Sequence, residues 1–136
     1  MNENYFEKAK SFAPTLLRVG MSLVFLWFGT QQILNTDMWT ALIPSWIVSM
    51  SGLSAVALVH FNGAFEIVFG LCLISGYFTS ITALLLALHM LDITFTVGYT
   101  GVGVRDFGLS IATIAVFLNG VDKWSLDAYL SKGSQV

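Results

Sequence analysis

Residues 53–98 read LSAVALVHFNGAFEIVFGLCLISGYFTSITALLLALHMLDITFTVG, an almost unbroken apolar stretch. Crossing about 30 Å of hydrocarbon takes roughly 20 apolar residues in a helix. The stretch is therefore long enough for two crossings, 53–76 and 77–98, with only Ser75, Gly76 and Tyr77 at the turn between them. We predict two antiparallel membrane helices that are neighbours in space.

Two further apolar stretches flank this pair, at about 14–34 and 102–121. The second is short, so we expect Arg105 and Asp106 to lie inside the span, near one end. Three other segments combine aromatic and polar residues, as interfacial helices do. They are residues 5–12, the loop from Trp39 to Trp46, and residues 124–130. The sequence thus predicts an all-α, single-domain four-helix membrane bundle, with short interfacial helices in the first loop and at the termini.

The composition supports this class and excludes others. Of 136 residues, 56% are hydrophobic and 10% are charged, whereas soluble domains carry about a quarter charged residues. The net charge is −2, with no basic block, which argues against a nucleic-acid partner. The lipid bilayer is the expected partner, together with a homo-oligomer or a larger membrane complex. The single cysteine, Cys72, cannot form an internal disulfide, and we interpret it as inert packing.

The distribution of lysines predicts the orientation. Four spans place both termini on one side, which carries Lys8, Lys10, Lys123 and Lys132, whereas the other side carries only Arg105. By the positive-inside rule both termini are cytoplasmic. We expect the protein in the inner membrane of a prokaryotic cell.

Ionisable side chains inside a bilayer are costly, about 2.5–3.5 kcal/mol each at its centre on translocon scales, and so need a reason. In this chain the polar residues lie between mid-bilayer and the outer ends of the spans. We predict one outer polar cluster, in which Glu66, His89 and Asp92 are the candidate catalytic residues, and Arg105, Asp106, Gln32 and Asn62 the candidate binding residues.

Helical periodicity turns this cluster inward, because each span has one polar and small-residue stripe. The four stripes are Arg18, Ser22, Phe25, Gly29 and Gln32; Asn62, Gly63, Glu66 and Gly70; His89, Asp92 and Thr96; and Asp106, Ser110, Thr113, Phe117 and Gly120. Glycines next to a carboxylate permit close approach of two membrane helices.

The charges in the cluster are unbalanced. Three acids, Glu66, Asp92 and Asp106, face one fixed cation, Arg105. Crowded carboxylates cannot all ionise in a low dielectric, so at least one is protonated or a histidine is charged. Such titrations are associated with functional sites. The alternative is a hydrogen-bonded network that only holds the helices in register.

A metal site is conceivable from ligand type, since His60 could join the other residues. The spacing shows no metal motif, however, and His60 lies near the outer end of its span. We therefore predict no metal and treat His60 as an interfacial residue.

Several motifs resemble the DoxX/DoxD-like family of small four-helix membrane proteins. They are Leu16-Leu17-Arg18-Val19-Gly20 with Phe25-Leu26-Trp27-Phe28-Gly29; Gly63-Ala64-Phe65-Glu66 with Gly70, Leu73 and Gly76; and Arg105-Asp106-Phe107-Gly108-Leu109 with Gly120 and Trp124-Ser125-Leu126-Asp127. The family's acidic position matches Glu66, and its Arg-Asp pair matches Arg105 and Asp106. The end of the first helix often carries a lysine in the family, but this chain has Gln31-Gln32 there. That departure makes Arg105 more important.

The resemblance implies two kinds of chemistry: oxidation of sulfur compounds with transfer to quinone, and thiol-redox complexes. The sequence shows no flavin motif, nucleotide loop or cysteine pair, and we expect no covalently bound cofactor. Electron transfer would then need a bound quinone or a partner subunit.

Three functional hypotheses follow. In the first, the protein is an oxidoreductase-associated subunit in which Glu66 and His89 exchange protons with a quinone, and Arg105 orients a carbonyl oxygen or an anion. Phe25, Phe65, Phe69 and Phe95 could pack on the ring, or could be core and lipid contacts. The second is a non-catalytic structural or assembly subunit. The third, a proton-coupled carrier, fits least because four short spans lack broken helices and repeats.

Overall fold

The computed structural model describes residues 3–133, which form seven helices and no strands. They are α1 (Glu3–Leu34), α2 (Thr36–Thr40), α3 (Ser45–Ser51), α4 (Ala55–Ser75), α5 (Thr79–Val97), α6 (Gly101–Asn119) and α7 (Leu126–Gly133). Four of them, α1, α4, α5 and α6, are long and apolar enough to cross a membrane. The all-helical membrane fold is thus confirmed.

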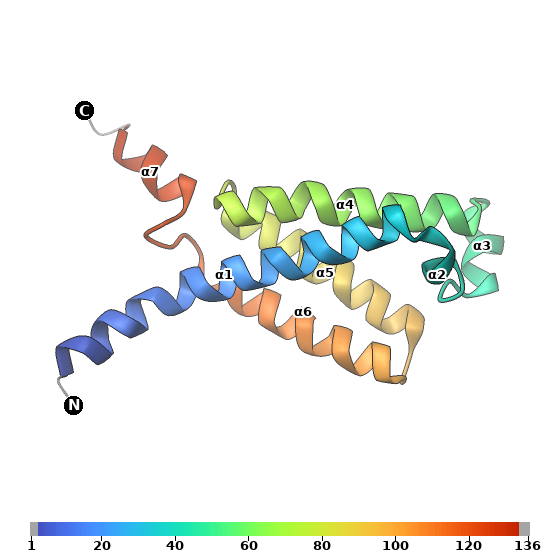
Figure 1. The fold of residues 1–136 in the computed structure, drawn as a ribbon, viewed down its shortest axis with the longest axis horizontal. Coiled ribbons are helices and arrows are strands. Elements are labelled where there is room, and N and C mark those ends of the chain that lie inside the picture. The colour runs from blue at the N-terminus through green and yellow to red at the C-terminus, as the bar shows by residue number, and fades with distance from the viewer. Residues whose placement is uncertain (1–2, 134–136) are drawn as a thin grey trace.

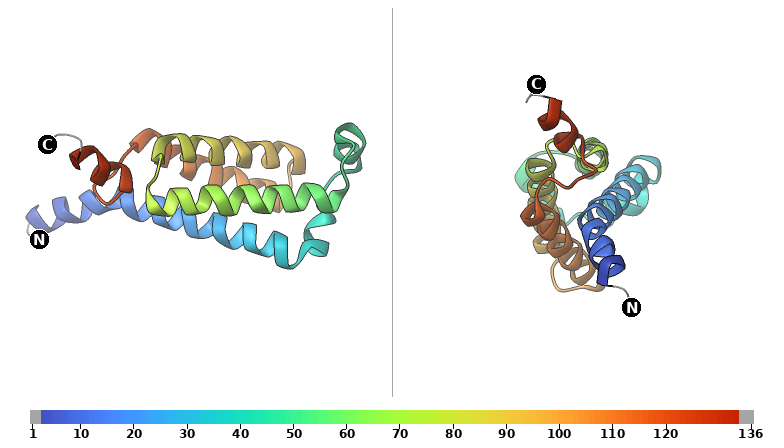
Figure 2. Two further views of the ribbon diagram at one scale, coloured as in Figure 1. Left: turned by 90° about the horizontal axis from the view of Figure 1, so that it is seen from above. Right: turned by 90° about the vertical axis from the view of Figure 1, so that its left-hand side faces the viewer.

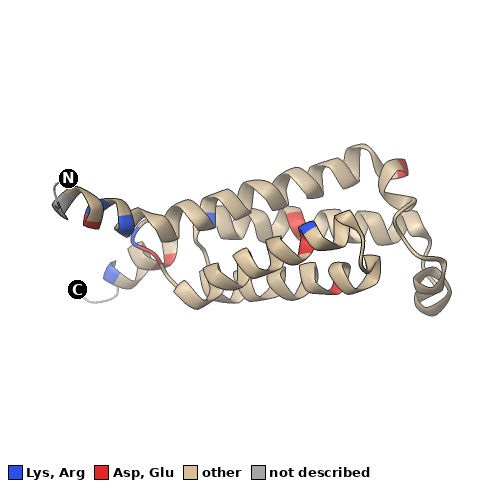
Figure 3. Cartoon of the chain, turned by 90° about the horizontal axis from the view of Figure 1, so that it is seen from below, with Lys and Arg blue, Asp and Glu red and all other residues tan. Residues whose placement is uncertain are grey.

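Both ends of the described chain lie at one end of the bundle, which we call the terminal end, and α2 and α3 lie at the opposite, distal end (Figure 1). The first turns of α1 extend beyond the other long helices (Figures 1 and 2). Charged residues gather near the termini, and a second group lies within the bundle (Figure 3).

Two predicted interfacial segments differ in detail from the structure. Residues 5–12 are not a separate helix, because α1 runs without a break through Pro14. Proline removes one backbone hydrogen bond, but a membrane helix tolerates that loss. The loop from Trp39 to Trp46 forms two short helices instead of one. Pro44 has an extended backbone (ψ 141°) at the N-cap of α3, so α2 cannot continue into it.

The turn between α4 and α5 is tight because Gly76 ends α4 in the left-handed conformation (φ 71°). The next helix begins with help from the C-terminal segment. Both carboxylate oxygens of Asp127 accept hydrogen bonds at the start of α5, from Phe78 N at 2.9 Å and Thr79 N at 2.7 Å. These bonds satisfy two of the free N–H groups at that helix end.

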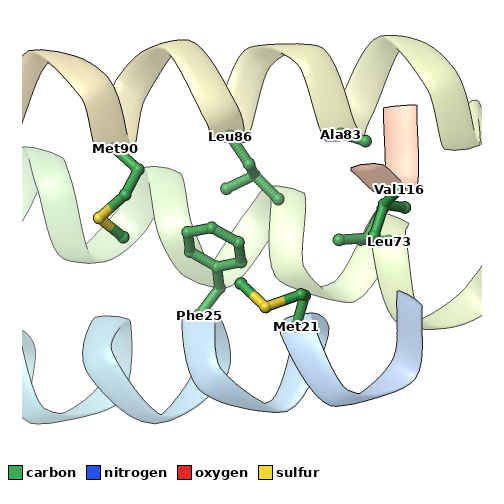
Figure 4. Packing of buried hydrophobic residues seen from close by; sticks show 7 residues of the cluster. All are labelled: Met21, Phe25, Leu73, Ala83, Leu86, Met90 and Val116. Carbon is green, nitrogen blue, oxygen red and sulfur yellow. The ribbon is translucent and has the colours of Figure 1, made fainter. Parts of the chain in front are cut away.

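The long helices pack most closely as two pairs, α1 with α4 and α5 with α6. Apolar side chains fill the space between the pairs: Met21, Phe25, Leu73, Ala83, Leu86, Met90 and Val116 (Figure 4). Phe25 of α1 points toward Leu86 of α5 in this view, and both are fully buried (Figure 4).

The α1–α4 pair crosses at two glycines. A Cβ on Gly29 would lie 2.7 Å from the carbonyl oxygen of Gly63, and one on Gly63 would lie 2.9 Å from that of Gly29. Only residues without a side chain permit this approach, as the glycine stripe predicted.

A buried ion pair joins the helices at the terminal end. Arg18 of α1 donates through Nε to Asp122, in the connection after α6, at 2.6 Å, and both side chains are buried. Its Nη1 also donates to the carbonyl oxygens of Leu73 and Ile74 at the end of α4. Thr15 donates to the same Asp122 carboxylate at 2.7 Å. The C-terminal connection is therefore fixed to α1 and α4.

Candidate functional site in the distal half

The predicted polar stripes of α1, α4 and α6 face the interior of the bundle, whereas none of His89, Asp92 and Thr96 in the predicted stripe of α5 is buried. Buried members include Arg18, Ser22, Phe25, Gly29, Gln32, Gly63, Glu66, Gly70, Asp106, Ser110 and Thr113. The helical period determines which side chains share a face, so the burial of the polar and small-residue stripes of α1, α4 and α6 follows from the sequence. The buried face of α5 is a different one, with Thr82, Leu86 and Met90.

Glu66 lies at the centre of the cluster and is 1% exposed. One of its carboxylate oxygens, Oε2, accepts a hydrogen bond from Gln32 Nε2 of α1 at 2.9 Å. The other, Oε1, lies 3.6 Å from His89 Nε2 of α5, which is too long for a hydrogen bond. A buried carboxylate is thus held by one neutral donor, with an imidazole next to it.

Glu66 lines the cavity that is described below, whereas His89 does not. Its ring packs against Phe65, with ring centroids 4.5 Å apart. His89 Nε2 is buried and has no hydrogen-bond partner among the described residues. The imidazole therefore lies next to the Glu66 carboxylate without a hydrogen bond to it.

Arg105 and Asp106 bind each other. Arg105 Nε donates to Asp106 Oδ1 at 2.7 Å, and the guanidinium carbon lies 4.7 Å from the centre of the Phe28 ring. Asp106 is buried, whereas the Arg105 side chain is 44% exposed. Arg105 thus pairs with Asp106 and forms no ion pair with Glu66 or Asp92.

A cavity of about 150 Å³ joins these residues, roughly ten times the room that one water molecule needs. Its polar lining consists of Gln32, Asn62, Glu66, Asp92, Thr96, Arg105 and Asp106. The rest of the wall is mostly apolar and comes from α1, α4, α5, α6 and the segment that contains α2 and α3. Such a combination of apolar walls and a few polar groups is typical of small-molecule sites.

Of the two roles considered for the phenylalanines, the structure favours core and lipid contacts over contact with a ligand ring. Phe28 and Trp39 line it, whereas Phe25, Phe65, Phe69 and Phe95 do not. Phe25 is in the core, Phe65 packs on Phe69 and His89, and Phe95 is 81% exposed. Phe28 meets the cavity next to Trp39 of α2, and the path of that short helix does not follow from the spacing within α1.

Two of the residues considered from the sequence, Asp92 and His60, are exposed. Asp92 lines the cavity but is exposed, and it has no ion pair or hydrogen bond within residues 3–133. His60 is exposed, and its Nε2 lies 3.0 Å from Thr36 Oγ1, as suits an interfacial residue. Among the described residues, no group of three His, Cys, Asp or Glu side chains is placed to hold a metal ion.

The sequence profile of the family described as DoxX matches residues 13–99, more than half of the chain. The chain belongs to the DoxX family. The DoxX match contains α4 and α5, with Glu66 and His89, and stops before Arg105 and Asp106 on α6. No curated protein and no solved structure matches the chain. Membership in DoxX supports the fold much more strongly than a particular chemistry.

Proposed function

We propose that this DoxX protein binds a membrane quinone in the distal cavity and acts as a small oxidoreductase-associated subunit. The observation that carries the proposal is a buried carboxylate, Glu66, on the wall of an otherwise largely apolar cavity inside a membrane bundle. Ionisable residues in such positions are retained for function more often than elsewhere.

The residues present suit a quinone. The cavity has room for a single-ring head group, and Phe28 and Trp39 offer aromatic surface next to it. A bound quinone would supply a carrier for two electrons and two protons. The chain has one cysteine and no flavin or nucleotide motif, so we infer that a partner subunit delivers the electrons.

Glu66 is the proton-exchanging residue in this proposal. Gln32 fixes one of its carboxylate oxygens, which orients the group, and His89 lies 3.6 Å from the other. A proton can therefore pass between His89 and Glu66 without crossing the cavity. Asn62, Arg105 and Asp106 orient the polar end of the ligand from the remaining walls.

The orientation belongs to the same proposal. Lys8, Lys10, Lys123 and Lys132 belong to the segments at the terminal end, and by the positive-inside rule this favours cytoplasmic termini. In this proposal the cavity lies in the outer half of a prokaryotic inner membrane.

A structural subunit is the second candidate. The Gln32–Glu66 hydrogen bond joins α1 to α4 next to the Gly29–Gly63 crossing, as a bond that fixes helix register would do. Interhelical hydrogen bonds in membranes average only about 0.6 kcal/mol, so such a role makes Glu66→Gln almost silent.

The deciding experiment compares wild type, Glu66→Gln and Asp37→Asn, a control that removes an exposed acid on α2 outside the cavity. Lipid extracts of the purified full-length proteins are assayed for quinone, and thermal unfolding in detergent is measured with and without added short-tailed quinone. A saturating ligand at 100 times its Kd stabilises by about 2.7 kcal/mol.

We expect quinone in the wild-type extract and a higher unfolding temperature with added quinone. Glu66→Gln should fold equally well but lose quinone reduction beside the partner subunit, because an amide cannot titrate. Absence of both quinone and stabilisation would refute the proposal. Equal stability together with equal activity of Glu66→Gln would favour the structural subunit.

A further inference from the structure

The cavity wall carries more acidic than basic side chains. Its ionisable members are Glu66, Asp92, Asp106 and Arg105. Arg105 donates through Nε to Asp106 at 2.7 Å, and its guanidinium lies over the Phe28 ring. Within residues 3–133, no lysine or arginine pairs with Glu66 or Asp92, and His89 is the titratable group next to Glu66.

The unused hydrogen-bonding atoms of the wall are mainly acceptors. Asp92 has both carboxylate oxygens free of hydrogen bonds within the described residues, and Asp106 has Oδ2. Gln32 is 5% exposed and donates a hydrogen bond through its amide nitrogen to Glu66. Its buried Oε1 has no hydrogen-bond partner within the described residues. The side chain of Asn62 and the Nη groups of Arg105 are the main unused donors.

A quinone and its reduced form, the quinol, differ in what they offer to such a wall. The carbonyl oxygens of a quinone only accept hydrogen bonds, whereas the hydroxyls of a quinol also donate them. A hydroxyl that donates to a carboxylate forms a charge-assisted bond, roughly twice as strong as a neutral one. An anionic ligand would instead lie next to Asp92, which has no cationic partner within the described residues, and like charges repel.

We infer that the cavity selects the uncharged, hydroxyl-bearing quinol over the quinone and rejects anions. This inference rests on the proposed function and specifies the ligand form that the site retains. An anionic substrate of the complex would then react on the partner subunit, and Arg105 serves Asp106 and not an incoming anion.

The test uses the purified full-length protein in detergent under anaerobic conditions. One probe pair is a decyl-benzoquinol and the matching decyl-benzoquinone, and a second pair is decanol and decanoate at pH 8. Dissociation constants are measured for wild type, Asp92→Asn and the control Asp37→Asn. Asp92 is exposed and unpaired, so its amide variant should fold normally.

We expect the quinol to bind at least about tenfold more tightly than the quinone, which raises the midpoint potential of the bound two-electron couple by about 30 mV. Decanol should bind more tightly than decanoate. Asp92→Asn should reduce both preferences, and Asp37→Asn should change neither.

Equal or tighter binding of the quinone would overturn this inference and leave the proposed quinone site standing. Binding of decanoate as tight as that of decanol would also overturn this inference and leave the quinone site standing. So would equal ligand preferences of Asp92→Asn and Asp37→Asn. Failure of both the quinol and the quinone to bind would overturn the proposed function itself.

Discussion

The guanidinium of Arg18 and the carboxylate of Asp122 meet at 2.6 Å although 104 residues separate them in the chain. Both side chains are buried, and Arg18 also donates to the last carbonyls of α4. This pair joins α1, α4 and the connection that follows α6, so we expect it to control the stability of the terminal end.

Asp122→Asn should destabilise the protein by about 3–5 kcal/mol, because it leaves the buried Arg18 charge without a counter-charge. Thermal or denaturant unfolding in detergent measures the change. The double variant Arg18→Gln/Asp122→Asn removes both charges of this pair and should lose less than the sum of the single variants. Additive losses would show that the pair is not coupled.

The same pair predicts a response to acid. Burial raises the pKa of the Asp122 carboxyl, but the hydrogen bonds from Arg18, Thr15 and the Trp124 backbone outweigh it and hold the pKa below the ordinary 3.8. A pKa lowered by folding stabilises the protein above the unfolded pKa, and this contribution is lost as pH falls through the folded pKa. The stability difference between wild type and Asp122→Asn should therefore be constant above about pH 5 and shrink below 3.8. A difference that stays constant through the acid range would contradict it.

The glycine crossing predicts a steric effect. Gly29→Ala should destabilise by about 1–3 kcal/mol, because the new Cβ would lie 2.7 Å from the Gly63 carbonyl oxygen. Gly20→Ala on the same helix is the matched control, since a Cβ there meets nothing within 4 Å. The control should be neutral or slightly stabilising because alanine favours helix. Similar unfolding temperatures for the two variants would argue against a close α1–α4 contact.

Asp127 caps α5 from outside that helix. Asp127→Ala should cost about 0.5–2 kcal/mol, the usual range for a lost N-cap, because the N–H groups of Phe78 and Thr79 lose their acceptors. Hydrogen exchange of these two amides should accelerate. Unchanged exchange in Asp127→Ala would mean that α7 does not cap α5 in solution.

The proposed orientation is tested by labelling. In a Cys72→Ala background, Ser45→Cys at the start of α3 should react with an impermeant thiol reagent in intact cells, and Lys132→Cys only after lysis. A reporter fused after Val136 should be active only in the cytoplasm. The reverse labelling pattern would invert the topology and the assignment of the cavity to the outer leaflet.

The long helices and their inward faces could be predicted because they depend on local information. Apolar length determines the spans, and the 3.6-residue period brings Gln32, Glu66 and Asp106 into one interior. The cation partners could not be predicted. The sequence offers Arg105 as the one fixed cation near three acids, but it does not show which acid Arg105 contacts. In the structure Arg105 donates a hydrogen bond to its chain neighbour Asp106.

The sequence alone also does not predict contacts between segments that are short or far apart in the chain. The Arg18–Asp122 pair joins residues far apart in the chain, and no periodicity signals it. Trp39 of α2 lines the cavity only because of the path that the segment between α1 and α4 takes. Local secondary-structure propensity does not determine that path. The lack of a hydrogen bond from His89 to Glu66 is likewise set by a few tenths of an ångström.

The pairing of α1 with α4, and of α5 with α6, has a consequence for biosynthesis. The α5–α6 hairpin is continuous in sequence and can form as soon as it leaves the ribosome. Gly29 and Gln32 of the first helix have no packing partner until α4 has been synthesised. Arg18 has no carboxylate partner until residue 122 has been synthesised. Chains that stall before that point therefore hold Arg18 against the α4 carbonyls without a counter-charge, which is costly inside a bilayer.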